Sequence, residues 1–151
     1  VQGIALTTAI ESHRRNKPQT MGSLYWQLND VWPAVSWSTI NHDGSWKLSH
    51  HMVKEAFKPC VVSLNLTQDS IHVHVIADRR WAAKGTLRLT WLDTNGRPYW
   101  SSLSPVSLQA SDNLQLVSLP RKGHQAGEVL QASWHEQGKL VDQSRLVISI
   151  R

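Results

Sequence analysis

Cysteine is almost absent from this chain, since Cys60 is the only one in 151 residues. An intrachain disulfide and a zinc site built from several cysteines are therefore both excluded. Apolar runs are short, well below the roughly 18 residues of a membrane-spanning helix, and nothing resembles a signal peptide. Dispersed glycines leave no phosphate-binding loop, and no G-x-S-x-G motif marks a nucleophilic serine. We predict no cofactor, no metal site and no membrane partner.

Acidic residues are also scarce, with 11 Asp and Glu against 16 Lys and Arg, which gives a net charge of +5. A basic balance can indicate a nucleic-acid partner. The basic residues are scattered, however, and the densest groups are short, such as Arg79-Arg80 and Arg121-Lys122. A solvated basic surface is therefore favoured, and nucleic-acid binding stays a third hypothesis.

Tryptophan is the residue type in excess, with eight Trp against one Phe and two Tyr. Indole rings stack on flat ligands such as sugars, but most aromatic side chains fill hydrophobic cores. We expect most of the eight to lie in the core and one or two to contact a ligand.

The stretch from Met21 to Pro33 organises the first part of the chain, because its apolar, aromatic run ends abruptly in Asn29 and Asp30. This pattern predicts a strand over residues 23–28 that is buried on both faces and opens onto a polar pocket. A helix precedes it and is stopped by Pro18. A second helix follows, capped by Ser45 or Ser49 and ended by Pro59. Helix, strand, long loop and helix make half of an α/β repeat, which cannot close a sheet alone.

The rest of the chain has the alternating pattern of an all-β domain. The expected strands cover Cys60–Leu66, Ser70–Asp78, Gly85–Asp93, Pro98–Leu108, Asn113–Leu119, Glu128–His135 and Leu140–Ile150. Seven short strands separated by turn signals are typical of an immunoglobulin-like sandwich. The composition changes near Pro59 without a flexible linker.

Few side chains offer catalytic chemistry. Glycosidases need two carboxylates about 5–10 Å apart, and Asp30 is the only one in a plausible pocket. Glu11 and Glu55 lie in helical patterns. Asp30 could bond a hydroxyl, orient a neighbour, or cap the following loop through backbone N–H groups. The pair His72-x-His74 shares a strand face and could bind a metal, but without a third ligand an exposed polar face of an edge or outer strand is favoured.

Residues 21–51 resemble the end of the catalytic domain in the β-mannosidases of glycoside hydrolase family 2. The matching elements are Leu24-Tyr25-Trp26-Gln27-Leu28-Asn29-Asp30, Trp32, Ser36-Trp37-Ser38 and Gly44-Ser45-Trp46-Lys47. The resemblance covers about residues 1–59, and the β-rich remainder is similar only in type.

The resemblance implies an α+β fragment. Residues 1–59 would be the C-terminal end of a (β/α)8 TIM barrel, comprising helix 7, strand 8 and helix 8, and residues 60–151 an immunoglobulin-like sandwich. Substrate-binding residues would be Trp26, Asn29, Asp30 and Trp32, near the carboxyl end of the strand.

The family is retaining, with one Glu as acid/base and one as nucleophile, and releases terminal non-reducing β-D-mannose. Both glutamates belong to earlier barrel strands, so this chain alone is expected to be inactive. Its partners would be a β-mannoside or oligosaccharide and the upstream domains of a longer parent. The chain opens in mid-pattern at Val1, as a piece of such a parent would, and a bacterial parent would be cytoplasmic.

The alternative is a non-catalytic carbohydrate-binding or structural module with a tryptophan of the sandwich as its sugar platform. The candidates are Trp81, Trp91, Trp100 and Trp134. Alternation assigns Trp91 to the core, whereas Trp81 falls in a loop and is the best platform candidate.

Overall fold

The computed structural model describes residues 1–149 and divides the chain into two compact units, residues 1–58 and the part that begins at Pro59. Ile150 and Arg151, which end the expected last strand and second domain, lie outside the described residues.

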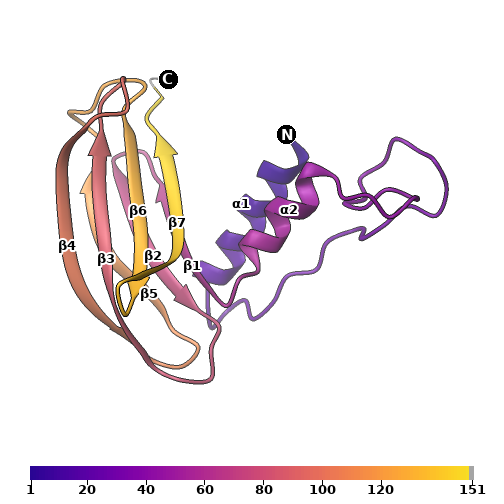
Figure 1. The fold of residues 1–151 in the computed structure, drawn as a ribbon, viewed down its shortest axis with the longest axis horizontal. Coiled ribbons are helices and arrows are strands. Elements are labelled where there is room, and N and C mark those ends of the chain that lie inside the picture. The colour runs from indigo at the N-terminus through magenta and orange to yellow at the C-terminus, as the bar shows by residue number, and fades with distance from the viewer. Residues whose placement is uncertain (150–151) are drawn as a thin grey trace. The chain divides into compact units, whose positions relative to one another are not determined.

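The first unit contains helix α1 (Gln2–Arg15) and helix α2 (Leu48–Ala56), which lie side by side (Figure 1). Their shared core consists of Ile10, Val53 and Ala56. The buried Arg14 side chain donates hydrogen bonds to the carbonyl oxygens of Ala56 and Lys58 and so fastens α1 to the end of α2. The two predicted helices are therefore present.

The predicted serine cap of the second helix is wrong. Lys47 occupies the N-cap position, and its side chain makes no capping hydrogen bond. Ser45 instead bonds Asp43 within the preceding turn, and Ser49 lies inside the helix. The hydroxyl of Ser45 is thus used by a tighter local contact.

Residues 21–46 form a long loop between the helices, seen as the purple trace in Figure 1. Its only β-pairings are single bridges, from Asn29 to Ile40 and from Ile40 to Trp46. The strand expected over residues 23–28, buried on both faces, is wrong for this chain, because Leu24 is fully exposed and Trp26 is 76% exposed. A central strand needs backbone partners on both sides, and no described strand of this unit lies beside it.

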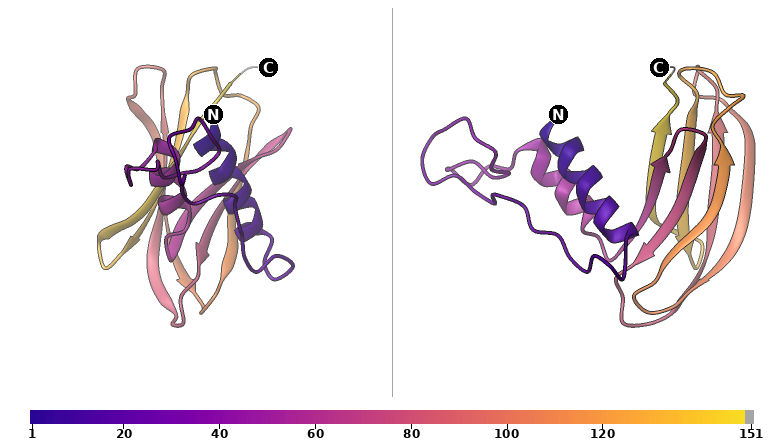
Figure 2. Two further views of the ribbon diagram at one scale, coloured as in Figure 1. Left: turned by 90° about the vertical axis from the view of Figure 1, so that its right-hand side faces the viewer. Right: turned by 180° about the vertical axis from the view of Figure 1, so that it is seen from behind.

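The second unit is the expected sandwich of seven antiparallel strands, whose two layers are visible in Figure 2. One sheet has the order β1-β2-β5 and the other β4-β3-β6-β7. The strands are β1 (Cys60–Leu66), β2 (Ser70–Ala77), β3 (Ala83–Leu92), β4 (Pro98–Leu108), β5 (Asn113–Pro120), β6 (Val129–Glu136) and β7 (Lys139–Val147).

Alternating side chains from both sheets fill the space between them. Trp134 and Ile71 are fully buried there, and Trp91 is 4% exposed, which confirms its predicted core position. The Trp134 ring lies so close to Gly85 that a Cβ at Gly85 would sit 2.5 Å from it. The Asp142 carboxylate accepts a hydrogen bond of 2.8 Å from the backbone N–H of Val62 and thereby joins the sheets.

The predicted exposed face around His72 and His74 is wrong. Strand β2 is the middle strand of its sheet, and His74 is only 9% exposed. Ile76, two residues further on the same face, is completely buried. The His74 ring contacts the side-chain amide oxygen of Asn113 at 3.3 Å. The apolar run that ends this strand indicates burial on both faces.

Candidate functional site

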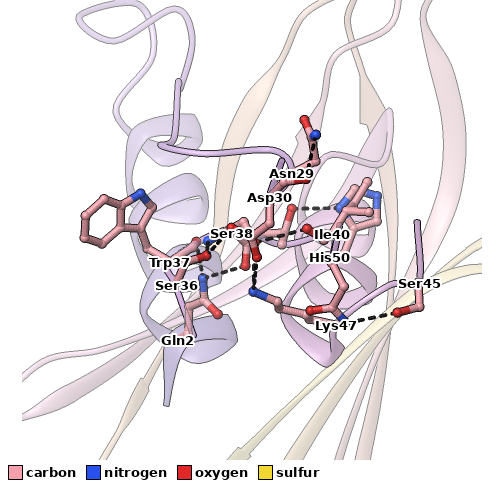
Figure 3. A network of polar contacts seen from close by, with 12 residues as sticks. Gln2, Asn29, Asp30, Ser36, Trp37, Ser38, Ile40, Ser45, Lys47 and His50 are labelled. Carbon is pink, nitrogen blue, oxygen red and sulfur yellow. Dashed lines mark hydrogen bonds and ion pairs between the residues drawn. The ribbon is translucent and has the colours of Figure 1, made fainter. Parts of the chain in front are cut away.

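The carboxylate of Asp30 lies at the base of a loop comprising residues 30–38, which we call the clasped loop. Asp30 is 6% exposed. The Ser36 hydroxyl donates to Oδ1 at 2.5 Å, and the Ser38 hydroxyl donates to Oδ2 at 2.6 Å. The ammonium of Lys47 donates to Oδ2 at 3.1 Å and to Ser38 Oγ at 2.7 Å (Figure 3). Both carboxylate oxygens are therefore engaged inside the protein.

These contacts keep Asp30 ionised. Hydrogen bonds from Ser36 and Ser38, with a smaller contribution from Lys47, lower the pKa of Asp30 to about 2 and outweigh the opposing effect of burial. A carboxylate with so low a pKa cannot deliver a proton near neutral pH. Its chemistry is that of a fixed, paired anion.

The indole rings of the clasped loop contrast with its base. Trp32 is 66% exposed and Trp37 is 64% exposed. The Gln2 side-chain amide donates to the carbonyl oxygens of Trp37, at 2.5 Å, and Ser38, at 3.3 Å. In Figure 3 the Trp37 indole extends away from the polar contacts that hold its backbone. The loop therefore combines a polar, fastened base with indole rings open to solvent.

The other sequence-predicted site residues lie along the same segment. Asn29 is exposed, and its amide donates to the Asp30 carbonyl at 3.2 Å. The Asp30 N–H donates to the Ile40 carbonyl at 3.0 Å, which holds the segment against the returning loop. Trp26 is exposed and precedes a cis peptide bond to Gln27.

Thr39 is the centre of a second set of polar contacts, which hold residues 25–28. The buried Thr39 hydroxyl donates to the Leu28 carbonyl at 3.0 Å and lies 3.2 Å from the Tyr25 hydroxyl. His50 Nδ1 is 3.0 Å from the Thr39 hydroxyl, and the His50 ring meets Trp46 edge-on. Residues 25–28 are therefore fixed through Thr39 although they form no strand.

Sequence reasoning did not assign roles to Ser36, Ser38, Lys47 and Gln2. The first three belong to the motifs that carry the family resemblance, which assigns them no function. An available signal was the Ser-x-Ser spacing a few residues after a buried acid, since short hydroxyl side chains return readily to a nearby carboxylate. The Gln2 contact spans 35 positions in sequence and has no local signal.

Carboxylates elsewhere in the first unit do not join Asp30. Glu11 pairs with Arg15 at 3.6 Å on α1, and Glu55 pairs with Lys58.

Within residues 1–149 no group of three or more His, Cys, Asp and Glu side chains is arranged to hold a metal ion. None of the described helices is long and apolar enough to cross a membrane. What the loop of the first unit presents to solvent is its indole rings and polar groups.

The sandwich tryptophans divide into buried and exposed ones. Trp91 and Trp134 lie in the core and cannot serve as surface platforms, whereas Trp81 is 66% exposed and Trp100 is 41% exposed. Trp81 lies between β2 and β3, as the sequence predicts.

Comparisons with known proteins relate the chain to β-mannosidases. It is 44% identical over 94 residues to Beta-mannosidase A of Aspergillus niger, a match that covers 59% of this chain and 10% of that enzyme. It is 39% identical over 93 residues to Beta-mannosidase A of Aspergillus fumigatus, covering 58% of this chain and 10% of the relative. The match thus spans about a tenth of these relatives.

Solved structures extend the similarity to nearly the whole chain. The β-D-mannosidase of Dictyoglomus thermophilum superposes with a TM-score of 0.90 at 27% identity, covering 96% of this chain and 18% of that one. The Amycolatopsis orientalis exo-chitosanase CsxA has a TM-score of 0.76 over 99% of this chain and 18% of its own, but at 19% identity it shows only the fold. The predicted resemblance to family 2 β-mannosidases is confirmed. The sequence model of the Mannosidase Ig/CBM-like domain family matches residues 69–148, which is more than half of the chain. This chain therefore belongs to that family.

Proposed function

We propose that the chain is the C-terminal part of a retaining β-mannosidase that removes terminal non-reducing β-D-mannose. In this proposal residues 1–59 supply helix 7, strand 8 and helix 8 of a (β/α)8 barrel, and residues 60–151 form an accessory sandwich. Homology to enzymes named β-mannosidases and the superposition over 96% of the chain support it.

One observation carries the barrel assignment. Residues 25–28 are held in place by hydrogen bonds to Thr39, yet Leu24, Trp26 and Leu28 are exposed. A barrel strand whose neighbouring strands belong to another part of the chain should look like this: fixed and apolar, but with no strand beside it. The relatives are long enough to supply those strands.

The proposed sugar contacts follow from this assignment. Barrel enzymes bind substrate at the carboxyl ends of their strands, and Asn29, Asp30 and the clasped loop follow directly after residues 24–28. Trp26 and Trp32 would stack on the sugar, because their rings are open, and the Asn29 amide would bond a hydroxyl. Asp30, already engaged by three donors, would orient the loop.

The two catalytic glutamates would come from upstream. A retaining glycosidase forms a covalent glycosyl intermediate on one carboxylate, while a second gives and then accepts a proton. Glu11 and Glu55 lie on helices in ion pairs and cannot replace them. The chain alone would therefore be inactive.

Hydrolysis of p-nitrophenyl β-mannoside tests the proposal. The full-length protein that contains this chain should release p-nitrophenol, and the 151-residue chain should not. Trp26→Ala in the full-length protein should lower kcat/KM, while Trp81→Ala should leave it unchanged. A full-length protein without activity toward β-mannosides would refute the assignment.

A non-catalytic carbohydrate-binding module is the second candidate, favoured by the exposed Trp81. In that case mannose should quench the tryptophan fluorescence of the 151-residue chain. The quenching should disappear in Trp81→Ala and persist in Trp26→Ala, which is the reverse of the order expected above.

A further inference from the structure

The tip of the clasped loop is placed without a hydrophobic core beneath it. Residues 31–35 are all exposed, with Val31 at 77% and Val35 at 108% exposure. The tip residues are apolar, so burial would normally fix them, yet here it does not. What holds the loop in place is the set of polar contacts at its base.

Those contacts converge on one buried anion. Ser36 and Ser38 come from the end of the loop, whereas Lys47 comes from the start of α2 and reaches across to Asp30. A buried carboxylate is costly unless it is paired and hydrogen-bonded. Removing the Lys47 charge would therefore leave an anion short of a partner, and the loop would have to rearrange to hydrate it.

Both exposed indoles of the loop depend on this base. Trp32 lies between Asp30 and Ser36, inside the segment that the carboxylate closes. Trp37 lies between the two serines, and Gln2 holds its carbonyl oxygen at 2.5 Å. A shift of the base would displace both rings together.

We propose that Lys47 is a positioning residue, which acts through Asp30 and the two serines to fix Trp32 and Trp37 for substrate. This inference rests on the proposed function, and it adds Lys47, Ser36, Ser38 and Trp37 to the residues that determine sugar binding. Lys47 contacts no sugar in this scheme. Lys47 acts on binding only through the positions of the Trp32 and Trp37 rings.

The first experiment needs only the 151-residue chain. With 5-fluorotryptophan incorporated, ¹⁹F NMR reports each indole, and single Trp→Phe variants assign the signals. Lys47→Met should shift or broaden the signals of Trp32 and Trp37 and leave those of Trp91 and Trp134 unchanged. Lys47→Arg, which keeps the charge and a donor, should restore the wild-type signals. Lys139→Met, at an exposed lysine of β7, is the matched control.

The second experiment measures hydrolysis by the full-length protein. Lys47→Met should raise KM for a β-mannoside roughly tenfold with kcat little changed, as expected when binding is lost equally from ground and transition state. A purely structural role would instead reduce the active fraction, lowering apparent kcat with KM unchanged. Ser36→Ala removes one donor and keeps the ion pair, so it tests the same point if Lys47→Met fails to fold.

The two readouts separate the hypotheses. Unmoved Trp32 and Trp37 signals, or an unchanged KM in both variants, would overturn the positioning role. An inactive wild-type full-length protein would refute the proposed function, and the NMR result would still decide whether Lys47 positions the indoles.

Discussion

The two units place their tryptophans differently, because only the sandwich buries any of its indole rings, although Trp81 and Trp100 of the sandwich are exposed. In the sandwich, Trp91 and Trp134 are buried between two sheets. In the first unit, Trp26, Trp32 and Trp37 are all more than half exposed. The sandwich is ordered by apolar burial, whereas the long loop of the first unit is ordered by hydrogen bonds around Asp30 and Thr39.

Buried indole rings contribute to the free energy of unfolding, whereas exposed ones are free to contact a ligand. A tryptophan buries roughly 150–250 Å², which is worth about 4–6 kcal/mol at ~25 cal/mol per Å². A hydrogen bond contributes a net of about 1 kcal/mol. Apolar surface therefore stabilises the sandwich, and in the loop of the first unit it stays available for other contacts.

Truncation of a buried and an exposed tryptophan should give the largest contrast. Trp134→Ala should reduce the free energy of unfolding of the sandwich by about 3–5 kcal/mol, because it leaves a cavity. It also removes the indole N–H that donates to Glu136 at 2.7 Å. Trp26→Ala should change stability by less than ~0.5 kcal/mol. Urea unfolding of both variants is the measurement, and equal losses would erase the distinction between the units.

Two glycines give a smaller contrast. A Cβ at Gly85 would lie 2.4 Å from the His135 carbonyl oxygen, whereas one at Gly22 meets nothing within 4 Å. Gly85→Ala should cost about 1–3 kcal/mol through overpacking, while Gly22→Ala should be neutral or stabilise by at most about 1 kcal/mol. Thermal unfolding of the two variants can be compared directly. A neutral Gly85→Ala would mean that the sandwich core is loosely packed.

The end of the sandwich offers a milder test. His124 stacks on Trp91 with ring centroids 3.7 Å apart and contacts Glu128 at 3.0 Å. His124→Ala should cost about 0.5–1.5 kcal/mol, the typical contribution of an aromatic pair. His42→Ala, in an exposed turn of the first unit, should cost less than ~0.5 kcal/mol. Denaturant midpoints should resolve the two, and the opposite order would contradict the structure.

Titration of Asp30 probes the polar side of the comparison. Since its folded pKa of about 2 lies below the ordinary value, the contacts stabilise the folded unit fully above pH ~4 and are lost as the pH falls toward 2. A ¹³C NMR titration of the Asp30 carboxyl carbon should give this midpoint. Ser36→Ala should raise it, because Ser36 is the largest cause of the shift. Ser45→Ala should leave the Asp30 midpoint unchanged. A wild-type midpoint near 4 would contradict the hydrogen bonds that hold the clasped loop at Asp30.

The sandwich was predictable because alternation is a local signal. Six of the expected strands lie within two residues of the observed ones, and the last, expected to run to Ile150, ends at Val147. The pattern failed at His74, because an apolar run after an alternating stretch indicates burial on the second face as well. Local hydrophobicity therefore located the strands well but assigned one of their faces wrongly.

The candidate site was predictable only in part. The apolar run that ends in Asn29 and Asp30 predicted a polar pocket, and the family resemblance added Trp32; all three lie in the long loop between the helices. The partners of Asp30 were missed because a side chain such as Lys47, 17 positions away, reaches its target through the fold of the loop. Whether residues 23–28 form a strand depends on hydrogen-bond partners that local sequence does not supply.

The edges of the four-stranded sheet have a consequence for association. Strand β4 forms one edge and carries Pro98 and Pro105, while β7 forms the other and carries Lys139 and Arg145. Proline and cationic side chains on edge strands discourage the addition of a foreign strand. The four-stranded sheet is thus protected at both of its edges against the addition of a strand from another chain. If the chain oligomerises on concentration, the contact should form through its uncovered indole and aliphatic groups, and mild detergent should reverse it.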